Sequence, residues 1–329
     1  MSSTIVVAGV TSLYMAMPVP DFPLPYASQR FPEWMRVEVS GAACHIASTV
    51  HTLGDEARLC TLVGEDLAGE AINTSLRARG LWGPGVVTAP RSSLGVVLVA
   101  SNGRRSGHPY VAAVNTVEYP VEVFRCLLHG ADLAVLTNTA FVRPLLEHAR
   151  ERHVPIAVDV HLITDVDDAY NRPWLEVADI IFCSHERLPC PPRQWVAKIF
   201  QRYPGCAVAA VGLGGRGCVM GLTDGSLVEA VAIAPRGVVS TAGAGDALFA
   251  SFVHSWLATG NPMAALEDAV LHAGWKVGDT FPGATSLTAV ELAQLRESHP
   301  VAMFLGRWDS QRMTARRGSA SHDSNQTRP

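Results

Sequence analysis

Short apolar runs alternate with helix-like segments through most of this chain, and this alternation limits the folds that the chain can adopt. Runs rich in Val, Ile and Ala recur at residues 4–10, 131–137, 154–160, 178–183 and 206–214. Helical periodicity lies between such runs, as at 143–153 and 193–203. Strands that alternate with helices form a mostly parallel sheet with helices on both faces, and such sheets bind ligands beyond the carboxyl ends of their strands. We therefore predict a three-layer, doubly wound α/β domain.

Two stretches do not follow the alternation. Residues 11–38 are rich in Pro and aromatic residues, and residues 94–113 indicate a hairpin that turns at the sequence SNGRR. We expect both stretches to form a small β-sheet beside the main sheet. Residues 307–329 lack apolar periodicity and are expected to form a disordered tail, so the folded domain is predicted to span residues 1–306.

Composition and motifs exclude several classes of function. The net charge of −4 and the pI near 6.3 give no basic surface for nucleic acid. No apolar run reaches the roughly 20 residues that span a bilayer, and the first residues have no basic region typical of a signal peptide, so we expect a cytoplasmic protein without a membrane partner. The seven scattered cysteines contain no CxxC pair. Neither a Walker motif nor a GxGxxG after the first strand is present, which disfavours P-loop NTPases and nicotinamide oxidoreductases.

The stretch VVSTAGAGDALFASFVHSW passes from a strand-like run through very small residues into a helix. Gly243, Ala244 and Gly245 leave backbone N–H groups uncovered at the helix N-terminus, where a phosphate is favoured. Asp246 follows, although a carboxylate beside a polyphosphate is repelled unless it takes a proton from an attacking hydroxyl. On these residues alone a simpler interpretation is equally open: the small residues let the helix pack closely, and Asp246 stabilises the helix dipole.

Four segments of the chain resemble the signatures of the ribokinase-like (PfkB-type) sugar and nucleoside kinases. STAGAGDALFASF is similar to the signature DTxGAGD, and residues 40–81 are similar to GGxxxNxA and the segment that follows it. VGLGGRGCVM is similar to the nucleotide-side loop, and residues 269–285 are similar to the late helix with its Gly-Ala turn. The resemblance covers residues 4–300. It implies a ribokinase-like fold with a β-sheet lid, made here from about 11–38 and 94–113, and transfer of the γ-phosphoryl group of ATP, with Mg²⁺, to a hydroxyl of a small sugar or nucleoside.

The resemblance also implies roles for individual residues. Asp246 is expected to remove the hydroxyl proton, and the N–H groups of Gly243, Ala244 and Gly245 are expected to form an anion hole. The implied nucleotide-binding residues are Ser184, Arg187, Gly212, Gly214, Gly217, Thr241, His272 and Gly283. The implied acceptor-binding residues are Thr11, Ser12, Gly41, His45 and Asp246. In this family the lid often forms a dimer interface, so a homodimer through the lid is a further implication.

The sequence departs from the family pattern on the phosphate side. Ser240 replaces the leading Asp of DTxGAGD, which leaves open whether a monovalent cation binds. Arg187 replaces the Glu of the family's NxxE, which orders Mg²⁺-bound water, so that Glu186 is the remaining candidate, acting through water. The fork of an arginine suits phosphate oxygens, but Arg187 is equally compatible with a solvated surface position.

The acceptor side departs from the pattern as well. His45 and His161 stand where the family has Asn, and Asp21 is the first Asp after the first strand, where most members have one close to that strand. Because Thr and Ser accept hydrogen bonds less strongly than a carboxylate, we expect a flatter and more apolar acceptor. Two interpretations are open for the large side chains near the first strand: they stack on such a ring, or they form the lid's own core. These residues are Tyr14, Met15, Met17, Phe22 and Tyr26.

Two functions remain open at this stage. The intact GAGD and GLGGRG segments favour an active ATP-dependent kinase. The replacements at Ser240 and Arg187 and the missing early Asp favour a nucleotide-binding regulatory protein of the same fold with little or no transfer.

Overall fold

A mostly parallel sheet forms the centre of the molecule. The computed structural model describes residues 2–102, 104–279 and 286–309, and within these ranges ten strands pair in the order β14-β13-β12-β11-β10-β9-β8-β1-β4-β5. The parallel strands are β1 (Thr4–Ala8), β4 (Glu56–Gly64), β5 (Val86–Ala89), β8 (Leu133–Leu136), β9 (Ile156–Leu162), β10 (Ile180–Ser184) and β11 (Val208–Gly212). Antiparallel pairing extends this sheet through β12 (Gly217–Leu222), β13 (Ser226–Val231) and β14 (Met303–Arg307).

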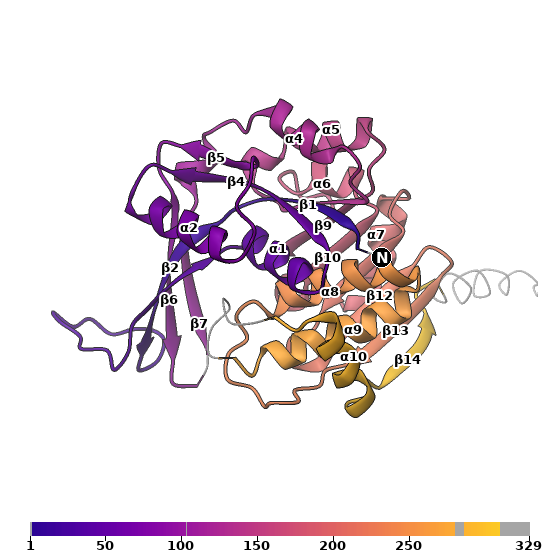
Figure 1. Cartoon of the computed structure of the whole chain (residues 1–329). Helices are drawn as coiled ribbons and strands as arrows, with labels where there is room; N and C mark the ends of the chain where they lie inside the picture. Colours follow the sequence, from indigo (N-terminus) through magenta and orange to yellow (C-terminus); the bar gives the residue numbers. More distant parts are fainter. Residues whose placement is uncertain (1, 103, 280–285, 310–329) are drawn as a thin grey trace, which may run out of the picture.

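Helices cover both faces of this sheet (Figure 1). One face packs against α1 (Ala42–Thr52), α2 (Leu67–Ala78), α8 (Ala244–Thr259), α9 (Pro262–Lys276) and α10 (Ala289–Ser298). The other face packs against α3 (Ala112–Asn115), α4 (Val121–Leu128), α5 (Leu145–Glu151), α6 (Arg172–Val177) and α7 (Pro192–Arg202). Alternate residues of β1 enter the two cores: Ile5 and Val7 enter the first, and Val6 and Ala8 enter the second. The three-layer α/β prediction is therefore confirmed.

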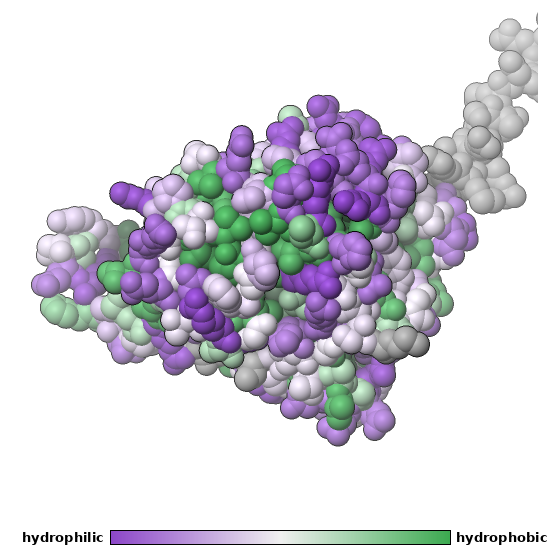
Figure 2. Space-filling model, turned by 45° about the horizontal axis from the view of Figure 1, so that its top comes forward, coloured by the Kyte–Doolittle hydropathy of each residue, from purple (hydrophilic) through white to green (hydrophobic). Residues whose placement is uncertain are grey.

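The two stretches outside the alternation form the predicted small sheet. Its order is β3 (Arg36–Ser40), β2 (Ser12–Val19), β6 (Ser93–Ala100) and β7 (Arg105–Tyr110), with β2 and β6 parallel and the other pairs antiparallel. We call this sheet and its loops the lid; it projects from one side of the body (Figure 1). In the space-filling view the lid extends to the left, and hydrophobic and hydrophilic residues are mixed on it (Figure 2).

The folded chain continues further than the predicted boundary at residue 306. Arg307 ends strand β14, and the Trp308 ring stacks on Phe200 with centroids 4.8 Å apart while its Nε1 donates to the carbonyl of Leu222. A short edge strand has too few apolar residues to show the alternation typical of a strand. For this reason the end of this segment was predicted to belong to the disordered tail. Residues 310–329 of the predicted tail lie outside the described residues. No helix in the described ranges is both long and apolar enough to cross a membrane.

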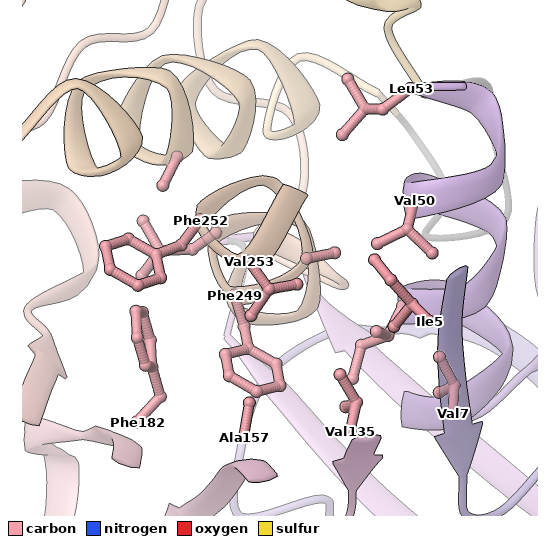
Figure 3. Packing of buried hydrophobic residues seen from close by; sticks show 14 of the residues in the cluster. Ile5, Val7, Val50, Leu53, Val135, Ala157, Phe182, Phe249, Phe252 and Val253 are labelled. Carbon is pink, nitrogen blue, oxygen red and sulfur yellow. The ribbon is translucent and has the colours of Figure 1, made fainter. Parts of the chain in front are cut away.

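Helix α8 is held in place by aromatic packing. Its Phe249 and Phe252 rings lie 5.0 and 5.1 Å from the ring of Phe182 on β10, and Figure 3 shows both rings and Val253 directed at the sheet. The helix also lies against α1 and α9, so that apolar residues occur on most of its circumference. This packing fixes the position of the first turn of α8, which carries Asp246.

We expect Phe252→Ala to lower the free energy of unfolding by about 3–5 kcal/mol, because the ring is fully buried and leaves a cavity. Urea denaturation measures this change. The matched control is Phe304→Ala on β14, where the ring is 62% exposed and the expected loss is below about 1 kcal/mol. Equal losses in the two variants would contradict the assignment of Phe252 to the core.

Candidate active site

A cleft of about 1430 Å³ lies between the lid and the main sheet. Its wall combines the inner face of the lid, the start of α1, the end of β9 and the segment that leads into α8. The residues with a functional side chain or backbone group at this wall are Tyr14, Arg36, Glu38, Gly41, His45, Arg105, His161, Thr241, Gly243, Gly245 and Asp246. The cleft thus lies at the carboxyl end of β9, as expected for an α/β sheet.

The start of α8 offers unpaired backbone donors to this cleft. Gly243 precedes the helix in the left-handed conformation, with φ of 74°. Among the described residues, no acceptor receives the N–H groups of Gly243 and Gly245, and the N–H of Ala244 donates only a long bond of 3.4 Å to the carbonyl of Thr241. Free N–H groups at the positive end of a helix dipole form an anion-binding site.

Gly245 distinguishes the two interpretations of the Gly-Ala-Gly turn. A Cβ added at Gly245 would meet no protein atom within 4 Å, and the residue does not need a positive φ. Neither helix packing nor backbone conformation therefore explains a glycine here. Because Gly245 lines the cleft, its missing side chain leaves room for a ligand, which favours the anion-binding interpretation.

Asp246 is the carboxylate next to these donors. Burial at the cleft wall raises its pKa to about 7, and the nearby charge of Asp159 adds to this increase. His161 and Arg105 oppose the increase, because their positive charges favour the ionised carboxylate. A carboxyl group with a pKa near neutrality is suited to accept a proton from a hydroxyl at physiological pH.

Asp159 and His161 form a charged pair at the end of β9. His161 has a φ of 54°, a conformation that residues other than glycine rarely adopt. The carboxylate of Asp159 accepts the backbone N–H of His161 at 2.8 Å, and its other oxygen lies 3.4 Å from His161 Nδ1. This contact raises the pKa of His161, mainly through the charge of Asp159, and so favours a cation near Asp246.

Two of the predicted acceptor-binding residues, Gly41 and His45, lie at the cleft wall. Gly41 precedes α1 with φ of 108°, and a Cβ there would lie 2.4 Å from the carbonyl of Val10. The Nε2 atom of His45 pairs with the hydroxyl of Ser40 at 2.8 Å. Burial, assisted by the charges of Lys276 and then Arg79, lowers the pKa of His45 to about 3, so the ring faces the cleft in its neutral form.

Thr11, Ser12 and His272 do not lie at the wall of this cleft, and their predicted binding roles stay predictions. Thr11 and Ser12 are fully buried, and the Ser12 hydroxyl donates to Ser93. His272 is also fully buried: its Nε2 accepts the N–H of Leu287, which leaves Nδ1 to pair with the Ser251 hydroxyl. The sequence motifs locate these residues along strands and helices, but they do not show that the side chains are buried in the core.

Of the other predicted nucleotide-side residues that the structure describes, only Thr241 lies at the cleft wall. Ser184, Glu186 and Arg187 lie on the turn after β10, with Glu186 and Arg187 exposed and the N–H of Glu186 bonded to the Ser184 hydroxyl. A hydrogen bond of 3.0 Å between His185 Nδ1 and the carbonyl of Gly212 joins this turn to the end of β11. No group of three or more His, Cys, Asp or Glu residues suited to a metal occurs in the described chain.

Gly212, Gly214 and Gly217 shape the turn between β11 and β12. Gly214 and Gly217 have φ of 60° and 108°, and a Cβ at Gly217 would lie 1.9 Å from the carbonyl of Ala230. A Cβ at Gly212 would lie 3.7 Å from Leu248, so this turn lies beside the start of α8. Gly283, also predicted to bind nucleotide, lies outside the described residues. The nucleotide roles of these residues stay predictions.

Arg105 is a site residue that sequence reasoning missed. It begins β7 of the lid and lines the cleft with Asp246, which lies more than a hundred residues away in the chain. The only sequence signal was a pair of arginines in the predicted hairpin turn, which is also typical of a solvated turn. Asp159, which favours the charged form of His161, is a second residue that was not among the predicted site residues.

A three-layer α/β body with an anion-binding helix start beneath a β-sheet lid is the architecture of the ribokinase-like kinases. The model of the pfkB family carbohydrate kinases matches residues 4–288, and the chain belongs to this family. No curated protein sequence gives a significant match.

Solved structures show the same fold at low sequence identity. The microbiome-derived acarbose kinase Mak1 is 20% identical, with a TM-score of 0.78 over 90% of this chain and 99% of that chain. The Arabidopsis thaliana ribokinase complexed with ribose and ATP is 17% identical, with a TM-score of 0.75 over 90% and 99%. The Burkholderia thailandensis nucleoside kinase in complex with inosine is 17% identical, with a TM-score of 0.70 over 89% and 98%. At such identities the likeness shows the fold alone.

We expect Gly245→Ala to fold normally but to weaken MgATP binding by at least about tenfold, because the added methyl group enters ligand space and blocks a charge-assisted contact. Isothermal titration calorimetry measures the affinity, and thermal unfolding without ligand verifies the fold. The matched control is Gly83→Ala, where a Cβ also meets no protein atom but the residue is not at the cleft. Unchanged MgATP affinity in Gly245→Ala would contradict the anion-binding interpretation.

Proposed function

We propose that this protein transfers the γ-phosphoryl group of ATP to a hydroxyl group of a small sugar or nucleoside. The observation that carries the proposal is the position of Asp246, a carboxyl group with a pKa of about 7, in the same cleft as the unpaired N–H groups of Gly243 and Gly245. Family membership supports it independently.

In the proposed reaction Asp246 takes the proton of the acceptor hydroxyl. The acceptor oxygen forms a bond to the γ-phosphorus, the bond from that phosphorus to the bridging oxygen breaks, and ADP leaves. The N–H groups of residues 243 to 245 stabilise the negative charge on the moving phosphoryl group. When bound with ATP, Mg²⁺ would neutralise part of the phosphate charge, and Glu186 is the candidate residue that would order its water.

The cleft supports an acceptor that carries a flat or apolar part. Its lid-side wall includes Tyr14, Phe31, Trp34, Val97 and Val99. Tyr14 pairs in register with Gly95, and a Cβ at Gly95 would lie 2.2 Å from the Tyr14 ring, so the glycine lets this ring lie flat against the strand. A flat aromatic face suits a nucleobase or a sugar ring.

The outer face of the lid supports a homodimer. Side chains alternate along a strand, so that Tyr14 faces the cleft and Met15 faces away from it. Met15, Val37, Leu94 and Val96 are large, apolar and exposed on three adjacent strands. We propose that this face pairs with a second copy of the chain.

We expect Asp246→Asn to lower kcat by at least about 10²-fold, because the amide cannot accept the proton. In the wild type kcat/KM rises with pH and reaches half its maximum near pH 7, since the carboxyl group is the active base only after it loses its proton. ATP consumption over a panel of sugars and nucleosides measures both effects.

The matched control for this variant is Glu70→Gln, which removes another acidic side chain from the first turn of a helix, α2, away from the cleft. This control retains activity. Activity that survives in Asp246→Asn would remove Asp246 from the role of base. Stabilisation of the wild type by MgATP without turnover on any acceptor would support the regulatory alternative.

We expect activity without added potassium, because Ser240 offers no carboxylate to a cation and the buried lysine at the end of the neighbouring helix α9 is already paired with an aspartate. The Lys276 ammonium is buried and lies 3.3 Å from the carboxylate of Asp279. The next residue, Val277, accepts the N–H groups of Val239 and Ser240 through its carbonyl. Replacing KCl with tetramethylammonium chloride at equal ionic strength should change kcat by less than about twofold, as expected when no bound ion is lost. A tenfold or larger loss would contradict this expectation.

A further inference from the structure

Arg105 points from the lid into the cleft. It begins β7 and pairs across the lid sheet with Val99, and both residues line the cleft wall. Residues that oppose each other on neighbouring strands place their side chains on the same face. Its neighbour Arg104 does not line the cleft. The guanidinium of Arg104 lies 3.8 Å from the carboxylate of Asp21 and above the ring of Phe22.

The guanidinium of Arg105 has no protein partner at its present position. In the chain as far as it is described, it makes no hydrogen bond and no ion pair, and solvent in the open cleft still reaches it. The surrounding protein nevertheless desolvates the group and lowers its pKa. Its five N–H donors line the cleft without a partner among the described residues and are therefore available to an anionic ligand.

The carboxylates that act on Arg105 lie on two sides of the proposed transfer path. Asp246 belongs to the acceptor side, and Glu186 lies on the turn assigned to the nucleotide side. Both raise the pKa of Arg105, which shows that the guanidinium is within electrostatic reach of each. A planar group with five donors at this position matches the oxygens of a phosphoryl group in transit between the two sides.

We propose that Arg105 is a catalytic residue of the lid, whose guanidinium donates hydrogen bonds to the γ-phosphoryl oxygens during transfer from ATP to the acceptor. This inference rests on the proposed function and adds a residue to it. Arg105 supplies positive charge from the lid, while the N–H groups of residues 243 to 245 supply donors from the body. The alternative ligand for Arg105 is an acidic group on the acceptor itself.

Affinities for MgATP and MgADP, measured by isothermal titration calorimetry without an acceptor, test the proposal in Arg105→Gln, Arg105→Lys and the control Arg104→Gln. Only ATP carries the γ-phosphoryl group, so Arg105→Gln should weaken MgATP binding by about tenfold and leave MgADP binding unchanged. Arg105→Lys should be intermediate, and Arg104→Gln should match the wild type. Thermal unfolding verifies that each variant is folded.

Kinetics give a second, independent test. Arg105→Gln should lower kcat by about 10²-fold or more with little change in the acceptor KM, as for other arginines that contact a phosphoryl group in transfer. Its pH profile should shift to higher pH, because the positive charge of Arg105 lowers the pKa of Asp246. Replacing a residue that only supports the structure of the lid would not shift the pH dependence of activity.

Three results would overturn the proposal. The first is an unchanged ratio of MgATP to MgADP affinity in Arg105→Gln. The second is an effect confined to the acceptor KM, which would assign Arg105 to an acidic group of the acceptor. The third is an equal loss in Arg104→Gln, which would indicate general damage to the lid. If the wild type transfers phosphate to no acceptor, the proposed function fails, but the nucleotide affinities still decide whether Arg105 contacts the γ-phosphoryl group.

Discussion

The structure depends on keeping one carboxylate and several unpaired N–H groups together in the first turn of α8. Asp246 is held where burial disfavours its charge, and the N–H donors beside it have no acceptor within the described chain. This arrangement persists because the rest of the helix is fixed independently. Phe249 and Phe252 pack on Phe182, and the carbonyl of Val277 holds the chain just before the turn. The stability of the body therefore offsets the strain at the site.

The charge of Asp246 is set by its burial and by groups from two separate parts of the chain, the end of β9 and the lid. Burial and the carboxylate of Asp159 raise its pKa, while His161 and Arg105 lower it. The balance matters because a base with a low pKa accepts protons poorly, and one with a high pKa is already protonated at neutral pH. Asp159 acts in both directions: it opposes the charge of Asp246 directly, and it raises the pKa of His161, whose positive charge then favours Asp246.

The sequence was informative where function depends on neighbouring residues, and less so where distant segments meet. The alternation of strands and helices and the Gly-Ala-Gly-Asp turn are local patterns, so the fold and the position of Asp246 followed from them. Arg105 was missed because its role depends on the register of a lid strand. The burial of Ser12 and His272 could not be predicted either, because a motif locates a residue along an element without giving the direction of its side chain. The predicted end of the domain lies before Trp308, because its stacking on Phe200 and its hydrogen bond to Leu222 produce no period in the sequence.

The division of groups between body and lid has a consequence for the reaction. The body holds Asp246 and the N–H donors, whereas the lid carries both Arg105 and the apolar wall expected to contact the acceptor. If the lid moved away, the cleft would lose its acceptor wall and its guanidinium at the same time. Because the charge of Arg105 lowers the pKa of Asp246, the same movement would also favour the protonated, inactive form of the base. One movement would thus remove both the stabilising cation and the active base, which would protect ATP from attack by water until an acceptor is bound.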